Sequence, residues 1–154
     1  QSDRRILSFG FVPAPERVRR LLGERTVLEV ARLSLADGVP FARVTVWCPE
    51  ELGAALSRDD VERSSFLEQL PVRLGGASQM IGAELVGDDD AALLGVPHGS
   101  PVLVAERITR NDAGRPVLVS QHVFPAHRMR FAVELPVDDG ALHPAGMRFV
   151  DRTG

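Results

Sequence analysis

The chain has 154 residues, of which 44% are hydrophobic and 25% charged, and its formal net charge is −3. This balance predicts one soluble globular domain and argues against direct binding to a nucleic-acid backbone. All 18 basic residues are arginine, which excludes pyridoxal Schiff bases and Walker phosphate loops, because both need a lysine amine. The single cysteine, Cys48, excludes an internal disulfide, and we expect a cytoplasmic protein without a membrane span or a secretion leader.

A short helix followed by a β-hairpin is predicted near the start of the chain. Glu16 places an acidic side chain at the positive end of the helix dipole, and Gly23 stands where a left-handed cap is expected. Residues 27–35 and 41–48 are rich in β-branched side chains, as strands are. The Ala-Asp-Gly sequence at 36–38 is typical of the turn that joins two such strands.

The same order of signals recurs later in the chain. Acidic residues at 88–90 predict a helix start, Gly95 its cap, and residues 102–110 and 117–124 a second hairpin. In each copy one proline follows another at a spacing of nine positions, Pro40 to Pro49 and Pro116 to Pro125. The sequence therefore predicts two repeated helix-hairpin units.

Between the two copies, residues 50–75 follow a different pattern. Ser57 with Asp60, and Ser65 with Glu68, have the spacing of a capping box, which marks the start of a helix. We therefore expect two short helices in this segment.

The remaining strands complete the predicted fold. Residues 77–86 and 131–135 predict strands, and residues 6–12 form either a strand or an arm. We expect an α+β fold, with an antiparallel sheet and helices packed on one of its faces. Residues 1–135 are expected to form this single ligand-binding domain, and residues 136–154 a C-terminal tail.

An ordered set of short motifs runs through most of the chain, from about Ser8 to Phe131. In chain order the motifs are Arg32-Leu33-x-x-Ala36-Asp37-Gly38-x-Pro40, Pro49-Glu50-Glu51-Leu52, Ser65-Phe66-Leu67, Glu84, Gly99-x-Pro101-Val102-Leu103, Arg107, Gly114-x-Pro116-Val117 and His127-Arg128-Met129-Arg130-Phe131. Together they resemble the UTRA domain, the effector-binding domain of HutC-type transcriptional regulators in the GntR superfamily, which has a chorismate lyase-like fold.

The resemblance implies the sensor part of a bacterial transcriptional regulator, without enzymatic activity or a cofactor. It implies a small-molecule effector, a homodimer, and DNA binding only through an N-terminal winged helix-turn-helix that is absent from this chain. A chorismate lyase-type enzyme is the alternative, because the fold is shared. Val44 and Leu118 stand where the family has glutamates, which argues against a positioned acid or base. A dimerisation module with a vestigial pocket is a third interpretation.

Two positions match the family's anion-binding residues. Arg32 matches an arginine that helps to hold an anionic group, for which a guanidinium is suited; alternatively it lies on the rim or pairs with Glu84. The family's second arginine is Ser34 here, so a strong phosphate contact is missing. Ser65 matches a serine at a helix start and either binds an anion or caps the helix.

Departures from the family pattern make the expected pocket apolar. Leu67 replaces a tyrosine, and Val44 and Leu118 replace the two glutamates. A buried hydroxyl without a partner costs about 1 to 3 kcal/mol, so a sugar phosphate is a poor fit. The sequence therefore predicts an anionic effector with an apolar body.

Alternation along one strand predicts further pocket residues. Starting from Leu118, it places Ser120, His122 and Phe124 on one face. His122 either contacts the effector or is an ordinary satisfied or exposed histidine. Arg107 is either a second anion contact or one partner of an ion pair, and the ion pair is the favoured interpretation. His122 and His127 lack the spacing of a metal site and His98 lies in a probable loop, so no metal site is predicted.

Overall fold

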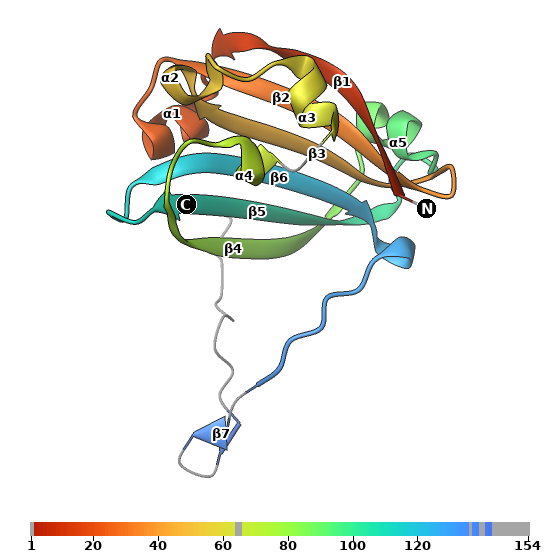
Figure 1. The fold of residues 1–154 in the computed structure, drawn as a ribbon. Coiled ribbons are helices and arrows are strands. Elements are labelled where there is room, and N and C mark those ends of the chain that lie inside the picture. Colours follow the sequence, from red (N-terminus) through yellow and green to blue (C-terminus); the bar gives the residue numbers. More distant parts are fainter. Residues whose placement is uncertain (1, 64–65, 136, 139–140, 143–154) are drawn as a thin grey trace.

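A six-stranded antiparallel sheet dominates the molecule, with the strand order β1-β2-β3-β6-β5-β4 (Figure 1). The computed structural model describes residues 2–63, 66–135, 137–138 and 141–142. The strands of this sheet are β1 (Ser2–Pro13), β2 (Thr26–Ala36), β3 (Val39–Pro49), β4 (Leu74–Leu85), β5 (Pro101–Asn111) and β6 (Pro116–Pro125). The predicted α+β class is confirmed, and residues 6–12 belong to an edge strand that pairs with β2.

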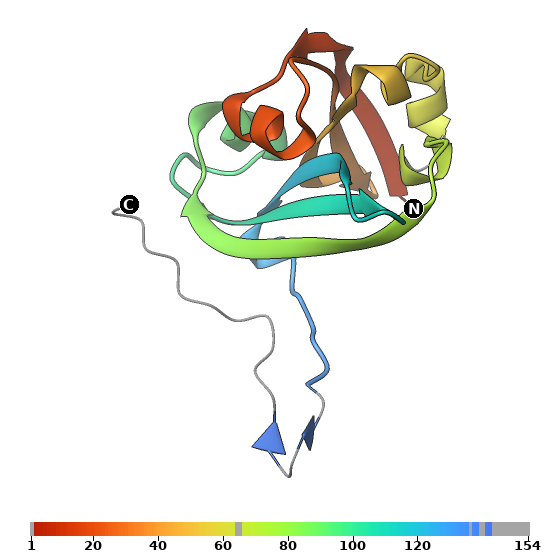
Figure 2. The same ribbon diagram turned by 90° about the vertical axis from the view of Figure 1, so that its left-hand side faces the viewer.

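Helices cover both faces of the sheet, so the expectation that they share one face is wrong. Helices α1 (Glu16–Leu22) and α5 (Asp88–Leu94) lie on one side, and α2 (Glu50–Gly53), α3 (Arg58–Arg63) and α4 (Phe66–Gln69) lie on the other (Figure 2). The reason is visible at Val27 and Leu28. These neighbours point to opposite faces of β2, and both are fully buried, so each face needs a cover.

None of the helices in the described part of the chain has the length and apolar character needed to cross a membrane.

The local signals at the ends of α1 and α5 are confirmed. Each helix ends at a glycine in the left-handed region, Gly23 with φ 72° and Gly95 with φ 66°. In the turn between β2 and β3, Asp37 and Gly38 both have positive φ, of 49° and 79°. This conformation matches the right-handed twist of the two strands that it joins.

The described part of residues 50–75 holds three short helices, not the two expected. Ser57 and Asp60 form the predicted capping box: the Ser57 amide donates to Asp60 Oδ2 at 3.0 Å, and the Asp60 amide donates to Ser57 Oγ at 3.2 Å. The additional helix is α2, a single turn directly after Pro49. The capping box expected at Ser65 lies outside the described residues.

The order helix, strand, strand occurs twice, as α1-β2-β3 and as α5-β5-β6. The second strand of each hairpin, β3 in one unit and β6 in the other, is called its return strand. These two return strands pair with each other at the centre of the sheet. Helix α1 packs against β6, and α5 packs against β3, so each helix covers the return strand of the other unit. That the two units are repeats stays a prediction.

The strand expected at residues 131–135 is wrong. This segment follows the 3₁₀ helix η1 (Ala126–Arg128), leads away from the sheet and has no regular secondary structure (Figure 1). Val133 is 74% exposed, and in the described part of the chain no strand pairs with this segment. Beyond it, β7 (Val137–Asp138) pairs only with β8 (Ala141–Leu142). Most of the tail expected at 136–154 lies outside the described residues, and the boundary at 135 stays a prediction.

Cys48 belongs to the core on the α2 side of the sheet. It is fully buried and packs in one cluster with residues of β2, β3, α3 and α4. Burial raises the pKa of the Cys48 thiol to about 12, because a thiolate would lose its hydration there. The thiol therefore stays protonated and behaves as a small apolar side chain.

Candidate functional site

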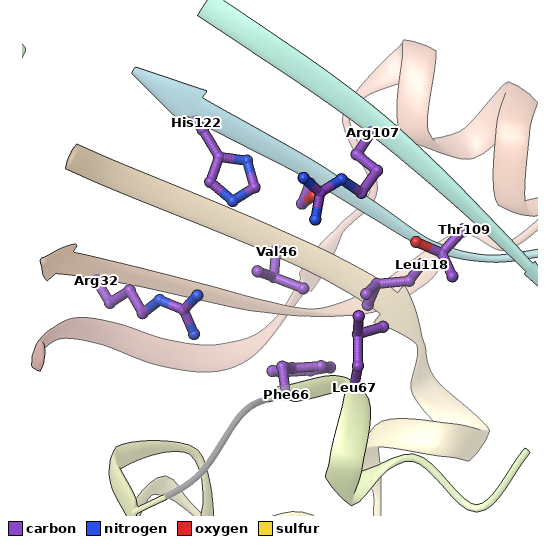
Figure 3. Close-up of a pocket in the computed structure, with 9 residues that line it drawn as sticks. Arg32, Val46, Phe66, Leu67, Arg107, Thr109, Leu118 and His122 are labelled. Carbon is purple, nitrogen blue, oxygen red and sulfur yellow. The ribbon is translucent and has the colours of Figure 1, made fainter. Parts of the chain in front are cut away.

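A cavity of about 90 Å³ lies between the sheet and α4, on the face opposite α1 and α5 (Figure 3). Four neighbouring strands supply its floor, and α4 supplies the opposing wall. Its lining residues are Arg32 from β2, Val46 from β3, Leu118, Ser120 and His122 from β6, Arg107 and Thr109 from β5, and Phe66 and Leu67 from α4.

Strand register brings these residues together. Arg32 pairs with Val44 on β3, and Val44 pairs with His122 on β6. In the neighbouring row Val46 pairs with Ser120, and Ser120 pairs with Arg107 on β5. Directly paired residues on adjacent strands point to the same face, so both rows present their side chains to the cavity side.

Arg32 is a partly buried cation without a neutralising partner. Its Nε atom is inaccessible to solvent and has no hydrogen-bond acceptor among the described residues, and the ion pair with Glu84 considered for it is not found there either. Burial lowers the pKa of the Arg32 guanidinium, and the positive charge of Arg4 lowers it further. The Arg32 side chain is therefore held in a position that an anion would stabilise.

Arg107 enters the cavity from β5. Its Nε and Nη2 atoms both donate to the side-chain oxygen of Gln79 on β4, at 3.0 and 2.8 Å. The ion pair favoured for Arg107 is not found in the described part of the chain. The two hydrogen bonds from Arg107 to Gln79 orient the guanidinium group. Because Gln79 is uncharged, it does not neutralise the positive charge of Arg107.

His122 is a neutral side chain between these cations. Its ring stacks on Phe124, with centroids 5.8 Å apart and planes inclined by 13°. The Nδ1 atom is buried and has no hydrogen-bond partner. Burial lowers the pKa of His122 to about 4, and the charges of Arg107, Arg32 and Arg43 lower it in the same direction. At neutral pH the ring is therefore uncharged.

The stability of the domain is expected to depend on pH through His122. Its folded pKa of about 4 lies below the ordinary value of 6.5, so between these values the unfolded chain binds a proton that the folded chain does not. The free energy of unfolding therefore falls as the pH is lowered from about 6.5 to 4, by up to about 1.4 kcal/mol per pH unit.

Urea denaturation at several pH values measures this dependence. His122→Gln should remove this contribution to the slope, whereas the exposed His127→Gln should leave the slope unchanged. Equal slopes for wild type and His122→Gln would contradict the expectation.

Six of the residues predicted for the site line this cavity: Arg32, Leu67, Arg107, Leu118, Ser120 and His122. Three others do not. Val44 and Phe124 are buried in the adjoining core, and Ser34 lies two positions beyond Arg32 on the same face of β2. Ser65 lies outside the described residues. That any of these residues binds the effector stays a prediction.

Sequence reasoning missed three lining residues, Val46, Phe66 and Thr109. Alternation would have found two of them, because Val46 follows Val44 by two positions and Thr109 follows Arg107 by two. Phe66 has no such signal, since α4 has only four residues and shows no periodicity. Its position depends on how α4 packs on the sheet.

The lining residues favour binding of an anion. Among the nine residues there are two arginines and no aspartate or glutamate. Within the described residues, no group of three or more His, Cys, Asp and Glu side chains could hold a metal ion. What the cavity offers is positive charge, the hydroxyls of Thr109 and Ser120, and an apolar wall.

Comparisons with known proteins agree with this architecture. The sequence model of the UTRA domain matches residues 1–130. Over 138 residues the chain is 33% identical to the HTH-type transcriptional regulator Rv0792c of Mycobacterium tuberculosis. This alignment covers 85% of this chain and 51% of that protein. Over 133 residues the chain is 23% identical to the HTH-type transcriptional repressor NagR of Bacillus subtilis, covering 82% and 55%.

The fold also matches a solved structure. The C-terminal domain of the histidine utilization repressor from Pseudomonas syringae pv. tomato superposes with a TM-score of 0.81 at 17% identity, covering 89% of this chain and 100% of that one. The chain spans about half the length of the curated relatives it matches. With a family match over most of its length and this fold, the chain belongs to the UTRA domain family.

Proposed function

We propose that this chain is the effector-binding domain of a bacterial transcriptional regulator, and that its effector is a small anion with an apolar body. The observation that carries the proposal is the pair of arginines, Arg32 and Arg107, that line one cavity and have no carboxylate partner among the residues that the structure describes. A buried or half-buried cation is costly unless it is paired, and a bound anion supplies the missing partner.

Other arginines of the chain are neutralised by acidic side chains, unlike the two arginines that line the cavity. Four of them form ion pairs with acidic side chains: Arg17 with Glu106, Arg43 with Asp90, Arg58 with Glu62, and Arg63 with Asp60. The chain as a whole carries more acidic than basic residues, 21 against 18. The half-buried Arg43 is thus neutralised by Asp90, whereas no ion pair of Arg32 or Arg107 is found among the described residues, which supports a binding role for the cavity.

The wall opposite the arginines supports an apolar body for the effector. Phe66 and Leu67 from α4 face Val46 and Leu118 from the sheet. A cavity of about 90 Å³ is smaller than the roughly 150 Å³ engineered cavity that binds benzene. The effector is therefore a compact molecule, or one that places only its anionic end inside.

The role in transcription rests on the relatives. Both curated relatives are named HTH-type regulators, and each is about twice as long as the matched region. We propose that a winged helix-turn-helix accompanies this domain in the full protein and makes the contact with DNA. A cytoplasmic homodimer without enzymatic activity or a cofactor completes the proposal.

A matched set of ligands tests the binding role. Propionate, butyrate and benzoate are each compared with the amide of the same acid in a thermal unfolding experiment. A carboxylate that binds should raise the melting temperature, by an amount equivalent to about 2.7 kcal/mol at a hundredfold excess over Kd, and its amide should not. Equal effects of acid and amide would refute an anion site, and turnover of chorismate by the chain would instead support the lyase.

A further inference from the structure

We infer that the ligand of this cavity is a dianion with two separate acidic groups, one for Arg32 and one for Arg107, joined by a short apolar body. The class that fits is a small dicarboxylate. This inference rests on the proposed function and adds the number and placement of the ligand's charges.

The two arginines reach the cavity from opposite ends. Arg32 stands on β2 and Arg107 on β5, with β3 and β6 between them. Three steps between adjacent strands place the two backbone positions on the order of 14 Å apart. The two guanidinium groups point toward each other, with His122 on one side and Phe66 and Leu67 on the other (Figure 3). An elongated ligand with an acidic group at each end can therefore contact both arginines.

The charges of the lining residues require two negative groups for neutrality. Arg32 and Arg107 contribute two positive charges, Gln79 orients Arg107 without neutralising it, and no lining residue is acidic. One carboxylate beside Arg32 would leave the charge of Arg107 unmatched. Two carboxylates neutralise both guanidinium groups in the same partly desolvated space.

His122 adds a hydrogen-bond donor between the two cations. Its buried Nδ1 has no hydrogen-bond partner among the described residues. The tautomer with a proton on Nδ1 would bury an N–H donor without an acceptor, which costs more free energy than burying an unprotonated ring nitrogen. The neutral ring therefore carries its proton on Nε2. Because Arg32, Arg107 and His122 all donate, the ligand must present acceptors to each, which carboxylate oxygens do.

Calorimetric titration of the full chain with matched acids tests the inference on the unaltered protein. Succinate, glutarate and adipate are each compared with their half-amides, which keep the size and shape but carry one charge. At least one diacid should bind tenfold or more tightly than its half-amide. A half-amide that binds as tightly as its diacid overturns the inference and leaves the anion site intact, whereas the failure of every acid, including the monocarboxylates, overturns both.

Two variants locate the second charge. Arg107→Gln should reduce the preference for the diacid to about the statistical factor of two, because only Arg32 remains to be neutralised. Arg110→Gln is the matched control: it lies on the same strand, donates to Ser78 and does not line the cavity, so the preference should persist. An unchanged preference in Arg107→Gln overturns the assignment of the second acidic group to Arg107.

Discussion

Replacement of Arg32 by methionine is expected to weaken anion binding about a hundredfold and, at the same time, to stabilise the ligand-free domain by about 1 kcal/mol. Methionine keeps an unbranched, flexible side chain of similar reach and removes the charge. The two effects have one cause. Arg32 Nε is buried without an acceptor, and its pKa is lowered by burial and by Arg4, so the free domain holds this cation at a cost that an anion offsets.

Titration calorimetry with the tightest-binding carboxylate and urea denaturation of the free domain measure the two effects. Arg17→Met is the control, because Arg17 lies on the other face and pairs with Glu106. It should leave binding unchanged and should not stabilise the domain. If Arg32→Met keeps wild-type affinity, or destabilises the domain by more than Arg17→Met does, Arg32 has a structural role and not the one proposed.

Leu28→Ala is expected to lower the free energy of unfolding by about 2 to 5 kcal/mol, the range for removing a fully buried leucine side chain. Leu28 is fully buried on β2, under α2. The packing there is tight: a Cβ atom built on Gly53 would lie 2.7 Å from Leu28 Cβ and 3.3 Å from Cys48 Sγ. The surrounding atoms therefore have little freedom to fill the space that alanine leaves.

The midpoint of urea unfolding, with the slope held as a check on two-state behaviour, measures this loss. Leu85→Ala is the matched control, because Leu85 is 76% exposed at the end of β4, and it should change stability by less than about 0.5 kcal/mol. A loss below 1 kcal/mol for Leu28→Ala would show that this part of the core relaxes and is not close-packed.

Signals within a few residues predicted the local structure well. The glycine caps of α1 and α5, the turn at Asp37 and Gly38, and the capping box at Ser57 are all where their sequences place them. Each depends on a dihedral preference or a hydrogen bond between near neighbours. For the same reason alternation along β6 correctly grouped Leu118, Ser120 and His122.

The errors concern features that depend on distant parts of the chain. Residues 131–135 have the composition of a strand, but none of the strands that the structure describes pairs with them. The placement of helices on both faces follows from burial of both sides of β2, which a partial alternation does not reveal. Arg107 finds Gln79, an uncharged partner 28 positions earlier, where the sequence alone favoured an ion pair.

The sequence by itself therefore determined the strands of the two hairpins, the turn between β2 and β3, the face on which the side chains of β6 lie, and the family to which the chain belongs. Only the tertiary structure decided that Arg32 and Arg107 share one cavity, because that depends on the register of four strands, β2, β3, β6 and β5. Register is set by pairings between residues far apart in the chain, such as Arg43 with Val123, and these pairings depend on packing of the whole core and not on local propensity.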